Sequence, residues 1–172
     1  MRIVCIVGAD RTGKSTLVDE FKSAGWLSKH FNPPKKSPYE EYREYADWLM
    51  SEGDPNGKYV IDRYMYCEFA YSKHYGRHTD MTIERMNEIE DDLLKLDPNA
   101  AVVYCQTDLE SNWRRICDEG KNEFKSIEEL AALRSEYRRV LLNSKLDLIE
   151  YNFEAGDTPG LVLAEIEKRE IT

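Results

Sequence analysis

The sequence has no apolar stretch that approaches the ~20 residues of a membrane-spanning helix. It also lacks a basic and then apolar leader, because Met1 runs directly into a strand-like pattern. No repeat, low-complexity tract or linker divides its 172 residues, of which 41% are hydrophobic. We therefore expect one compact domain, residues 1–172, that has no membrane partner.

Cysteine is scarce, and the four that occur show no C-x-x-C spacing: Cys5, Cys67, Cys105 and Cys117. Cys5 and Cys105 fall within predicted strands, which favours reduced, buried thiols over disulfides or metal ligands. The three histidines also lack metal-ligand spacing, and His30, His74 and His78 are expected at the surface or in loops. These features predict a cytoplasmic protein.

The chain has fewer basic than acidic residues. The chain has 24 lysines and arginines against 33 acidic residues, which gives a net charge of −9. A surface that holds a nucleic-acid polymer needs the opposite balance, so such a partner is disfavoured. A small basic pocket for a single nucleotide is compatible with this charge, and small-molecule nucleotide partners are what we expect.

The first sixteen residues carry the strongest pattern in the chain. Arg2–Val7 is a short, apolar and mostly β-branched run that predicts a buried strand. The next nine residues fit G-x-x-x-x-G-K-[ST] at every fixed position: Gly8, Ala9, Asp10, Arg11, Thr12, Gly13, Lys14, Ser15 and Thr16. A helical pattern resumes at Leu17, so the motif has the strand–loop–helix setting that it requires.

Each residue type in this loop suits a triphosphate. Gly8 and Gly13 allow the backbone to wrap closely around phosphate oxygens, and the free N–H groups at the helix start attract anions. Lys14 supplies a charge for the β- and γ-phosphates, and the Ser15 hydroxyl is a ligand for Mg²⁺. The loop predicts an ATP site with Mg²⁺ as cofactor.

Strands and helices alternate along the rest of the chain. Strands are expected over residues 2–7, 26–31, 58–62, 100–105 and 146–151, and helices over 14–24, 38–50, 65–75, 82–96, 108–117, 126–142 and 159–170. Thr107 or Asp108 caps the fifth helix. Alternation of this kind predicts a three-layer α/β P-loop NTPase fold, with a five-stranded parallel sheet flanked by helices. The polar segment at about 118–126 is expected to form a short lid.

In such sheets, ligands bind at the carboxyl ends of the strands. Asp62 and Arg63 lie at the end of the third predicted strand. An aspartate in that position is suited to hold Mg²⁺, and the planar guanidinium beside it is suited to clamp phosphoryl oxygens. A purely structural Asp–Arg pair is the alternative interpretation.

Three segments resemble the thymidylate kinase family. Asp10–Thr16 is similar to the family's D-R-x-G-K-S-T loop, and Asp62–Tyr71 is similar to D-R-Y-x-x-S-x-x-A-[YF], with Cys67 in place of the serine. Phe31–Lys36 resembles an F-x-P-x-R-like segment, with lysine in place of arginine. The resemblance covers nearly the whole chain and extends more loosely to viral deoxynucleoside monophosphate kinases.

The resemblance implies phosphoryl transfer from ATP-Mg²⁺ to a deoxynucleoside monophosphate, with dTMP as the favoured acceptor. Lys14, Arg11 and Arg63 would neutralise the transferred group, while Ser15 and Asp62 would hold Mg²⁺. The acceptor would contact a wider set of residues: Asp10, Phe31, Lys35, Lys36, Tyr39, Arg43, Arg63 and Tyr71.

The base would be held by the helix after Pro38. Tyr39 and Arg43 are four residues apart and share a helix face, so a ring and a guanidinium can grip one flat ligand. Tyr42 is an alternative stacking residue. In the lid, Lys121 and Lys125 are candidates to bring positive charge onto the phosphoryl group.

Other functions stay open at this point. A deoxynucleoside kinase would share the phosphate loop and use a carboxylate, such as Glu40 or Glu41, toward a 5′-hydroxyl. A non-enzymatic nucleotide-binding module would need no acceptor pocket. The resemblance also allows a homodimer.

Overall fold

The computed structural model describes residues 1–120 and 123–169, and its centre is a sheet of five parallel strands. The strands are β1 (Arg2–Val7), β2 (Leu27–His30), β3 (Lys58–Asp62), β4 (Ala101–Cys105) and β5 (Asp147–Tyr151). They lie in the order β2-β3-β1-β4-β5, so β1 occupies the middle, with Cys5 between Ile61 and Val102. The five-stranded parallel sheet expected from the sequence is confirmed.

The described residues form seven α-helices, six between strands and one after β5. They are α1 (Lys14–Ser23), α2 (Pro38–Glu52), α3 (Met65–Tyr75), α4 (Ile83–Leu96), α5 (Leu109–Asp118), α6 (Ile127–Leu141) and α7 (Pro159–Lys168). A single 3₁₀ turn, η1 (Phe153–Ala155), follows β5. Each agrees with an expected helix, and the ends differ by one or two residues.

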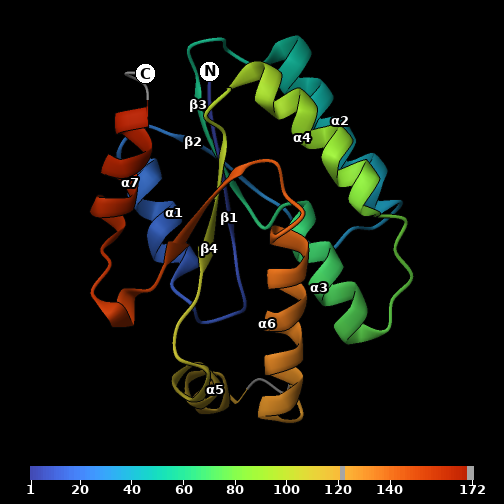
Figure 1. Cartoon of the computed structure of the whole chain (residues 1–172), viewed down its shortest axis with the longest axis vertical. Coiled ribbons are helices and arrows are strands. Elements are labelled where there is room, and N and C mark those ends of the chain that lie inside the picture. Colours follow the sequence, from blue (N-terminus) through green and yellow to red (C-terminus); the bar gives the residue numbers. More distant parts are fainter. Residues whose placement is uncertain (121–122, 170–172) are drawn as a thin grey trace.

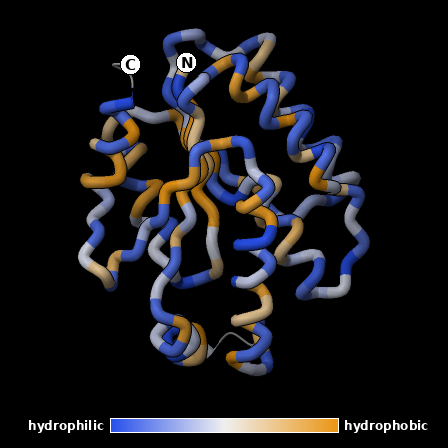
Figure 2. Tube along the Cα trace, in the orientation of Figure 1, coloured by the Kyte–Doolittle hydropathy of each residue, from blue (hydrophilic) through white to orange (hydrophobic). Residues whose placement is uncertain are grey.

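Helices cover both faces of the sheet. Figure 1 shows α1 and α7 on one side, and α2, α3, α4 and α6 on the other. The alternation of side chains along β1 divides the core in the same way, because Val4 and Ile6 face α1 while Ile3 and Cys5 face the opposite layer. Figure 2 shows hydrophobic residues gathered on the strands, with hydrophilic residues along the outer helix surfaces.

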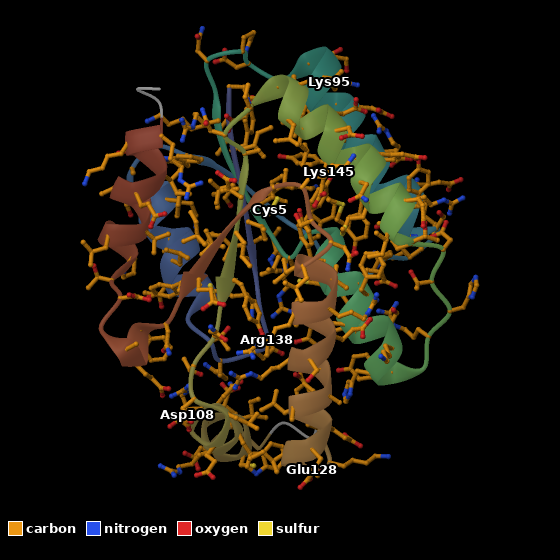
Figure 3. The ribbon with its side chains drawn as sticks, in the orientation of Figure 1. Cys5, Lys95, Asp108, Glu128, Arg138 and Lys145 are labelled. Atoms are coloured by element: carbon orange, nitrogen blue, oxygen red, sulfur yellow. The ribbon has the colours of Figure 1, made fainter. Side chains whose placement is uncertain are left out.

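Side-chain caps fix where the helices begin. The Ser37 hydroxyl accepts a hydrogen bond from the Glu40 N–H at the start of α2, and the Asp108 carboxylate does the same for Ser111 at the start of α5. Asp108, rather than Thr107, is therefore the cap of α5. In Figure 3, Asp108 and Glu128 mark the end of the molecule away from both termini, and Cys5 lies in its interior.

Two further expectations from the sequence can be compared with the described residues. Cys5, Cys67 and Cys105 are buried free thiols, and Cys117 is an exposed one. Burial raises the pKa of Cys5 and of Cys105 above the ordinary thiol range. No helix in residues 1–120 or 123–169 is long and apolar enough to cross a membrane.

A buried carboxylate ties α4 to the segment that enters β5. Glu90 is fully buried, and it accepts hydrogen bonds from the Tyr66 hydroxyl (2.7 Å), the Ser144 hydroxyl (2.6 Å) and the Lys145 backbone N–H (2.8 Å). Three donors, one on α3 and two in the segment before β5, therefore depend on one carboxylate. When a buried donor loses its only acceptor, the folded state is destabilised by the full free energy of desolvating that donor.

We expect Glu90→Ala to lower the free energy of unfolding by about 3 kcal/mol, because it leaves these three donors without an acceptor. Urea unfolding followed by circular dichroism measures the effect. Glu88→Ala is the matched control, since Glu88 lies on the exposed side of α4 and accepts a solvent-exposed hydrogen bond from the Tyr39 hydroxyl at 3.2 Å. Equal stability of the two variants would contradict the structural role of Glu90.

Candidate functional site

The loop after β1 takes a backbone path that only glycine permits at its start. Gly8 has φ 143°, and a Cβ atom placed there would lie 2.3 Å from the Cys105 carbonyl oxygen. Gly13 has φ 87° and forms the N-terminal cap of α1. Arg11 has a φ of 62°, which is uncommon for a residue with a side chain. The loop therefore lies against β4 and leads directly into α1.

Lys14 is held inside this loop. Its side chain is 6% exposed, and Nζ donates to the Ala9 carbonyl oxygen at 2.5 Å and lies 3.8 Å from the Asp10 carboxylate. Burial lowers the pKa of Lys14, while the charge of Asp10 opposes that shift. An ammonium with so little water around it gains strongly from an added anion.

A cavity of about 760 Å³ opens in front of the loop. Its lining includes Arg11, Gly13, Lys14, Ser15, Thr16, Asp62 and Arg63, which are all residues expected at a triphosphate. The opposite wall comes from the segment that follows β5, where the Arg115 guanidinium lies 5.2 Å from the centre of the Phe153 ring. Arg115 also pairs with Glu154, so this wall is connected to α5.

Asp62 ends β3 within this cavity. Its Oδ2 atom is hydrogen-bonded to His30 Nδ1 at 2.6 Å, and its buried Oδ1 atom has no partner among the described residues. His30 ends β2 and lines the same cavity, and its side chain is exposed, as the sequence predicts. An unpaired carboxylate oxygen in the cavity that Ser15 also lines fits Mg²⁺, which usually takes one or two protein ligands and completes its shell with water and phosphate.

The described residues contain no cluster of three or more histidine, cysteine or acidic side chains that could hold a metal ion. Ser15 and Asp62, which the sequence predicts as Mg²⁺ ligands, both line the larger cavity. Because Mg²⁺ in nucleotide sites is bound largely through substrate phosphates, a dense protein cage is not required.

Arg63 connects the large cavity to a second, smaller one. It has φ 58°, its N–H donates to the Ile6 carbonyl oxygen at 3.1 Å, and its guanidinium lies 2.6 Å from Asp10 Oδ1. Burial tends to raise the pKa of Asp10, but hydrogen bonding to Glu123 and the charges of Lys14 and Arg63 hold it below its ordinary value. Asp10, Arg63 and Glu123 line both cavities.

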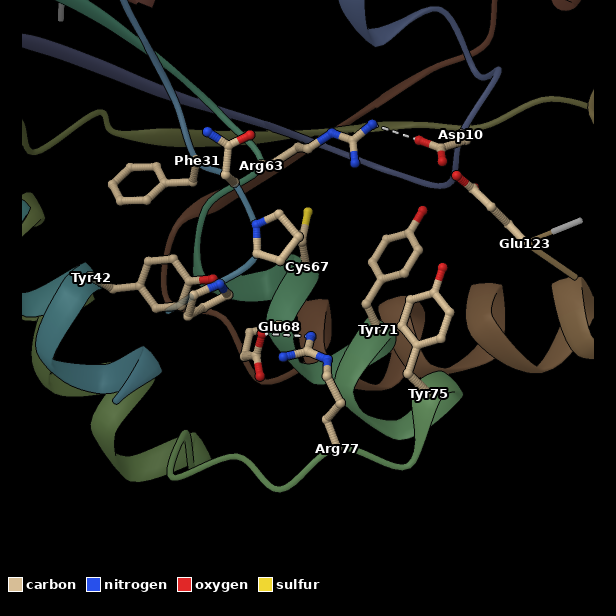
Figure 4. Close-up of a pocket in the computed structure, with 13 residues that line it drawn as sticks. Asp10, Phe31, Tyr42, Arg63, Cys67, Glu68, Tyr71, Tyr75, Arg77 and Glu123 are labelled. Carbon is tan, nitrogen blue, oxygen red and sulfur yellow. Dashed lines mark hydrogen bonds and ion pairs between the residues drawn. The ribbon is translucent and has the colours of Figure 1, made fainter. Parts of the chain in front are cut away.

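The second cavity has a volume of about 190 Å³, and Figure 4 shows the side chains around it. Its lining brings together Asp10, Phe31, Arg63 and Tyr71, four of the residues that the sequence predicts at an acceptor. One wall is the face of α3 with four-residue spacing, formed by Cys67, Tyr71 and Tyr75. Tyr42 and Phe31 face it, with ring centroids 5.4 Å apart.

Three charged residues of this lining are not among those predicted from the sequence: Glu68, Arg77 and Glu123. Glu68 is nevertheless the one charged residue within Met65–Tyr71, an otherwise uncharged stretch of α3, and this pattern in the sequence could have indicated a functional residue. Burying a charged side chain in such a helix destabilises the fold unless the charge is paired or used for binding. Arg77 and Glu123 carry no comparable signal, because both lie outside the helices.

Tyr39 and Arg43, which the sequence predicts to hold the base, line neither of the two cavities. The Arg43 guanidinium pairs with Asp47 (Nε to Oδ1, 2.8 Å) and with Asp92 of α4 (2.6 Å). The Tyr39 ring lies under the Arg85 guanidinium, 4.5 Å from its centre. The cause is the packing of α4 alongside α2, which presents charged partners to this face.

Lys35 and Lys36 line a neighbouring groove rather than the second cavity. Lys36 forms an ion pair with Glu44, and the backbone N–H groups of both lysines donate to Glu41. Both hydrogen bonds use Glu41 Oε1, and neither Glu41 nor Glu40 lines the second cavity.

The predicted lid is described only in part. Lys121 lies outside the described residues. Lys125 is exposed and lines neither of the two cavities, while its backbone N–H donates to Glu129 at 2.8 Å. The acidic side of this segment does reach the site, because Glu119 pairs with Arg11 and Glu123 lies beside Asp10.

No protein-family model matches the chain. The YorR protein of the SPbeta prophage in Bacillus subtilis (strain 168) is 28% identical over 167 residues, which cover 91% of this chain and 90% of that protein. A crystal structure of YorR from Bacillus subtilis in complex with phosphorylated GDP superposes with a TM-score of 0.75 and 20% identity, over 97% of this chain and 98% of that one.

Two kinases are similar at lower levels. Deoxyadenosine kinase from M. mycoides with bound dCTP gives a TM-score of 0.58 and 20% identity, over 98% of this chain and all (100%) of that one. Polyphosphate kinase 2 from Arthrobacter aurescens TC1 superposes with a TM-score of 0.59 and 16% identity, over 87% of this chain and 60% of that one. The chain thus has the α/β fold of the P-loop kinases, as the sequence predicts.

We expect Arg43→Ala to weaken the fold without affecting ligands. The variant removes the link between α2 and Asp92 of α4, so the free energy of unfolding should fall by about 1 kcal/mol. Equilibrium titration with nucleotides should give unchanged dissociation constants. A selective loss of affinity for one nucleoside monophosphate would instead restore the base-holding role of Arg43.

Proposed function

We propose that the chain transfers the γ-phosphoryl group of ATP-Mg²⁺ to a deoxynucleoside monophosphate and so forms the diphosphate. The observation that carries this proposal is that the two cavities meet at Asp10 and Arg63. A triphosphate in the larger cavity and an acceptor in the smaller one would face each other across the Arg63 guanidinium. A protein that only binds a nucleotide would not need the second cavity.

Such transfer depends mainly on positioning and on neutralising the charge of the phosphoryl group. Lys14 would contact the β- and γ-phosphates, and Arg11 would neutralise the transferred group once released from Glu119. Arg63 would hold the acceptor phosphate in line with it, because a guanidinium can bind two phosphoryl groups through its separate N–H donors.

Mg²⁺ would be held by Ser15 and, directly or through water, by the unpaired oxygen of Asp62. When bound, the ion would neutralise charge on the β- and γ-phosphates. His30 would keep Asp62 in place through its hydrogen bond to the other carboxylate oxygen.

Two lines of support concern the acceptor. The Asp62–Tyr71 motif resembles thymidylate kinases and favours dTMP. The structures of YorR with phosphorylated GDP and of deoxyadenosine kinase with dCTP support a nucleotide as the ligand. The acceptor phosphate is assigned to Arg63 rather than to Lys35 or Lys36, because only Arg63 lines the cavity.

A deoxynucleoside kinase is a second candidate, and Asp10 favours it. This carboxylate lies at the junction of the cavities, and its pKa is lowered, so it is ionised near neutral pH. It is therefore available as a proton acceptor for a 5′-hydroxyl. In the monophosphate kinase, the same group would contact the sugar or the 5′-phosphate region of the acceptor.

Three further parts of the proposal come from the sequence. The chain would act as one P-loop kinase domain in the cytoplasm, with residues 118–126 as a lid over the nucleotides and a homodimer as an allowed state. Arginine is absent between Gly120 and Ala132, so Arg11 would supply the charge that a lid arginine otherwise brings.

Release of ADP from ATP-Mg²⁺ tests these alternatives directly. Each deoxynucleoside and each deoxynucleoside monophosphate is offered separately, and Lys14→Ala serves as the inactive control. Turnover with monophosphates supports the proposal, and turnover confined to nucleosides supports the second candidate. Nucleotide binding without turnover for any acceptor would leave only a binding module.

We expect Arg63→Lys to lower kcat at least tenfold while it changes the acceptor KM by less, on the order of threefold. A lysine keeps the charge but replaces the planar fork by one point donor, so the loss should fall mainly on the transition state. Steady-state kinetics with the best acceptor give both constants. A change in KM alone would assign Arg63 to ground-state binding.

A further inference from the structure

The acceptor cavity contains a buried carboxylate that no part of phosphoryl transfer uses. The Glu68 side chain is 1% exposed, and its Oε1 atom has no hydrogen-bond partner among the described residues. Its Oε2 atom accepts a hydrogen bond from the Arg77 guanidinium at 3.2 Å. Burial raises the pKa of Glu68, and the nearby Arg77 charge and Thr79 hydroxyl offset part of that rise.

The fold places Arg77 beside Glu68 by reversing the chain at the end of α3. Gly76 adopts φ 61°, and the Arg77 N–H then donates to the Ser72 carbonyl oxygen at 2.8 Å, which is a glycine-dependent helix cap. The Arg77 side chain is 36% exposed. A donor at the mouth of the cavity thus accompanies an acceptor deep within it.

The two ends of the cavity differ in chemistry. Figure 4 shows Asp10 and Arg63 at one end, and Glu68 with Arg77 at the other, with Tyr42 and Tyr71 on opposite sides between them. An acceptor whose phosphate lies at Arg63 therefore extends its base toward Glu68. Flat walls of aromatic rings on either side suit a nucleobase that enters edge first.

We propose that Glu68 and Arg77 read the base of the acceptor and select bases with a lactam edge, in which a ring N–H stands next to a carbonyl. In this arrangement, Glu68 Oε1 accepts from the ring N–H, and Arg77 donates to the adjacent carbonyl oxygen. Thymine, uracil and guanine have this edge. The inference rests on the proposed acceptor role of this cavity.

Cytosine and adenine carry a lone pair at the corresponding ring nitrogen. Placed against Glu68, that lone pair would face a second acceptor and leave both without a donor. Two opposed acceptors in a water-poor cavity are costly, and the loss of one buried hydrogen bond to a charged group changes affinity by about tenfold or more. Selection therefore depends on the charge state and donor pattern of the side chain at position 68.

Glu68→Gln tests the inference because its amide can donate as well as accept. We expect wild-type protein to bind dTMP, dUMP and dGMP about tenfold or more tightly than dCMP and dAMP. In Glu68→Gln, that ratio should fall to about twofold or less. The control is Glu136→Gln, which alters a buried carboxylate on α6 that pairs with Lys73 and Arg139 and lines neither nucleotide cavity.

Dissociation constants from calorimetry are measured for the five monophosphates and for their nucleosides, and thermal unfolding confirms that both variants fold. An equal loss for all bases in Glu68→Gln, or a wild-type preference for dCMP or dAMP, would overturn the inference. Binding with lactam selectivity but without ADP release would uphold it while the proposed kinase activity fails.

Discussion

The ion pair between Asp10 and Arg63 joins the loop after β1 to the turn after β3, with 2.6 Å between the charged atoms. Two neighbouring strands of the sheet end there, so the pair fixes the relative positions of the phosphate loop and α3. The Asp10 backbone carbonyl also accepts from Asn112 Nδ2 of α5 at 2.8 Å. Asp10 thereby connects the loop after β1 and α5, which line the larger cavity, to the turn that leads into α3, which lines the smaller one. Substrates would bind on opposite sides of this contact, and their phosphates would compete with Asp10 for Arg63.

Carboxylates accompany the cations throughout the site. Arg11 pairs with Glu119, Lys14 lies 3.8 Å from Asp10, and Arg63 also contacts Asp10. Lys14 is the buried cation of this set, and the nearby Asp10 carboxylate offsets part of the cost of taking it out of water. The pairs also show how a chain of net charge −9 can gather cations around one cavity. The positive charge is local, and the acidic partners limit its attraction for extended polyanions.

The sequence predicts the fold well because the patterns that define it are local. A β-branched run, a glycine-rich loop and a hydroxyl cap each act within a few residues, and nearly all helix and strand ends follow from them. The sequence predicts the residues around the base less well. Tyr39 and Arg43 have the expected spacing, but they contact Glu88 and Asp92 of α4. Which face of α2 meets α4 depends on long-range packing that spacing along one helix does not encode. Arg77 lies beside Glu68 because the chain reverses at Gly76, and no sequence pattern indicates that contact.

Arg11 and Arg63 both have left-handed backbone angles, which cost roughly 1 kcal/mol each for a residue with a side chain. At Arg63, the contacts to Ile6 and Asp10 hold the residue in that conformation. Its turn directly precedes α3, which lines the second cavity from Cys67 to Tyr75. The position of Glu68 on α3 therefore depends on the same turn that places the Arg63 guanidinium beside Asp10. Under the proposed function, this turn would set the distance between the guanidinium that holds the acceptor phosphate and the carboxylate that reads its base.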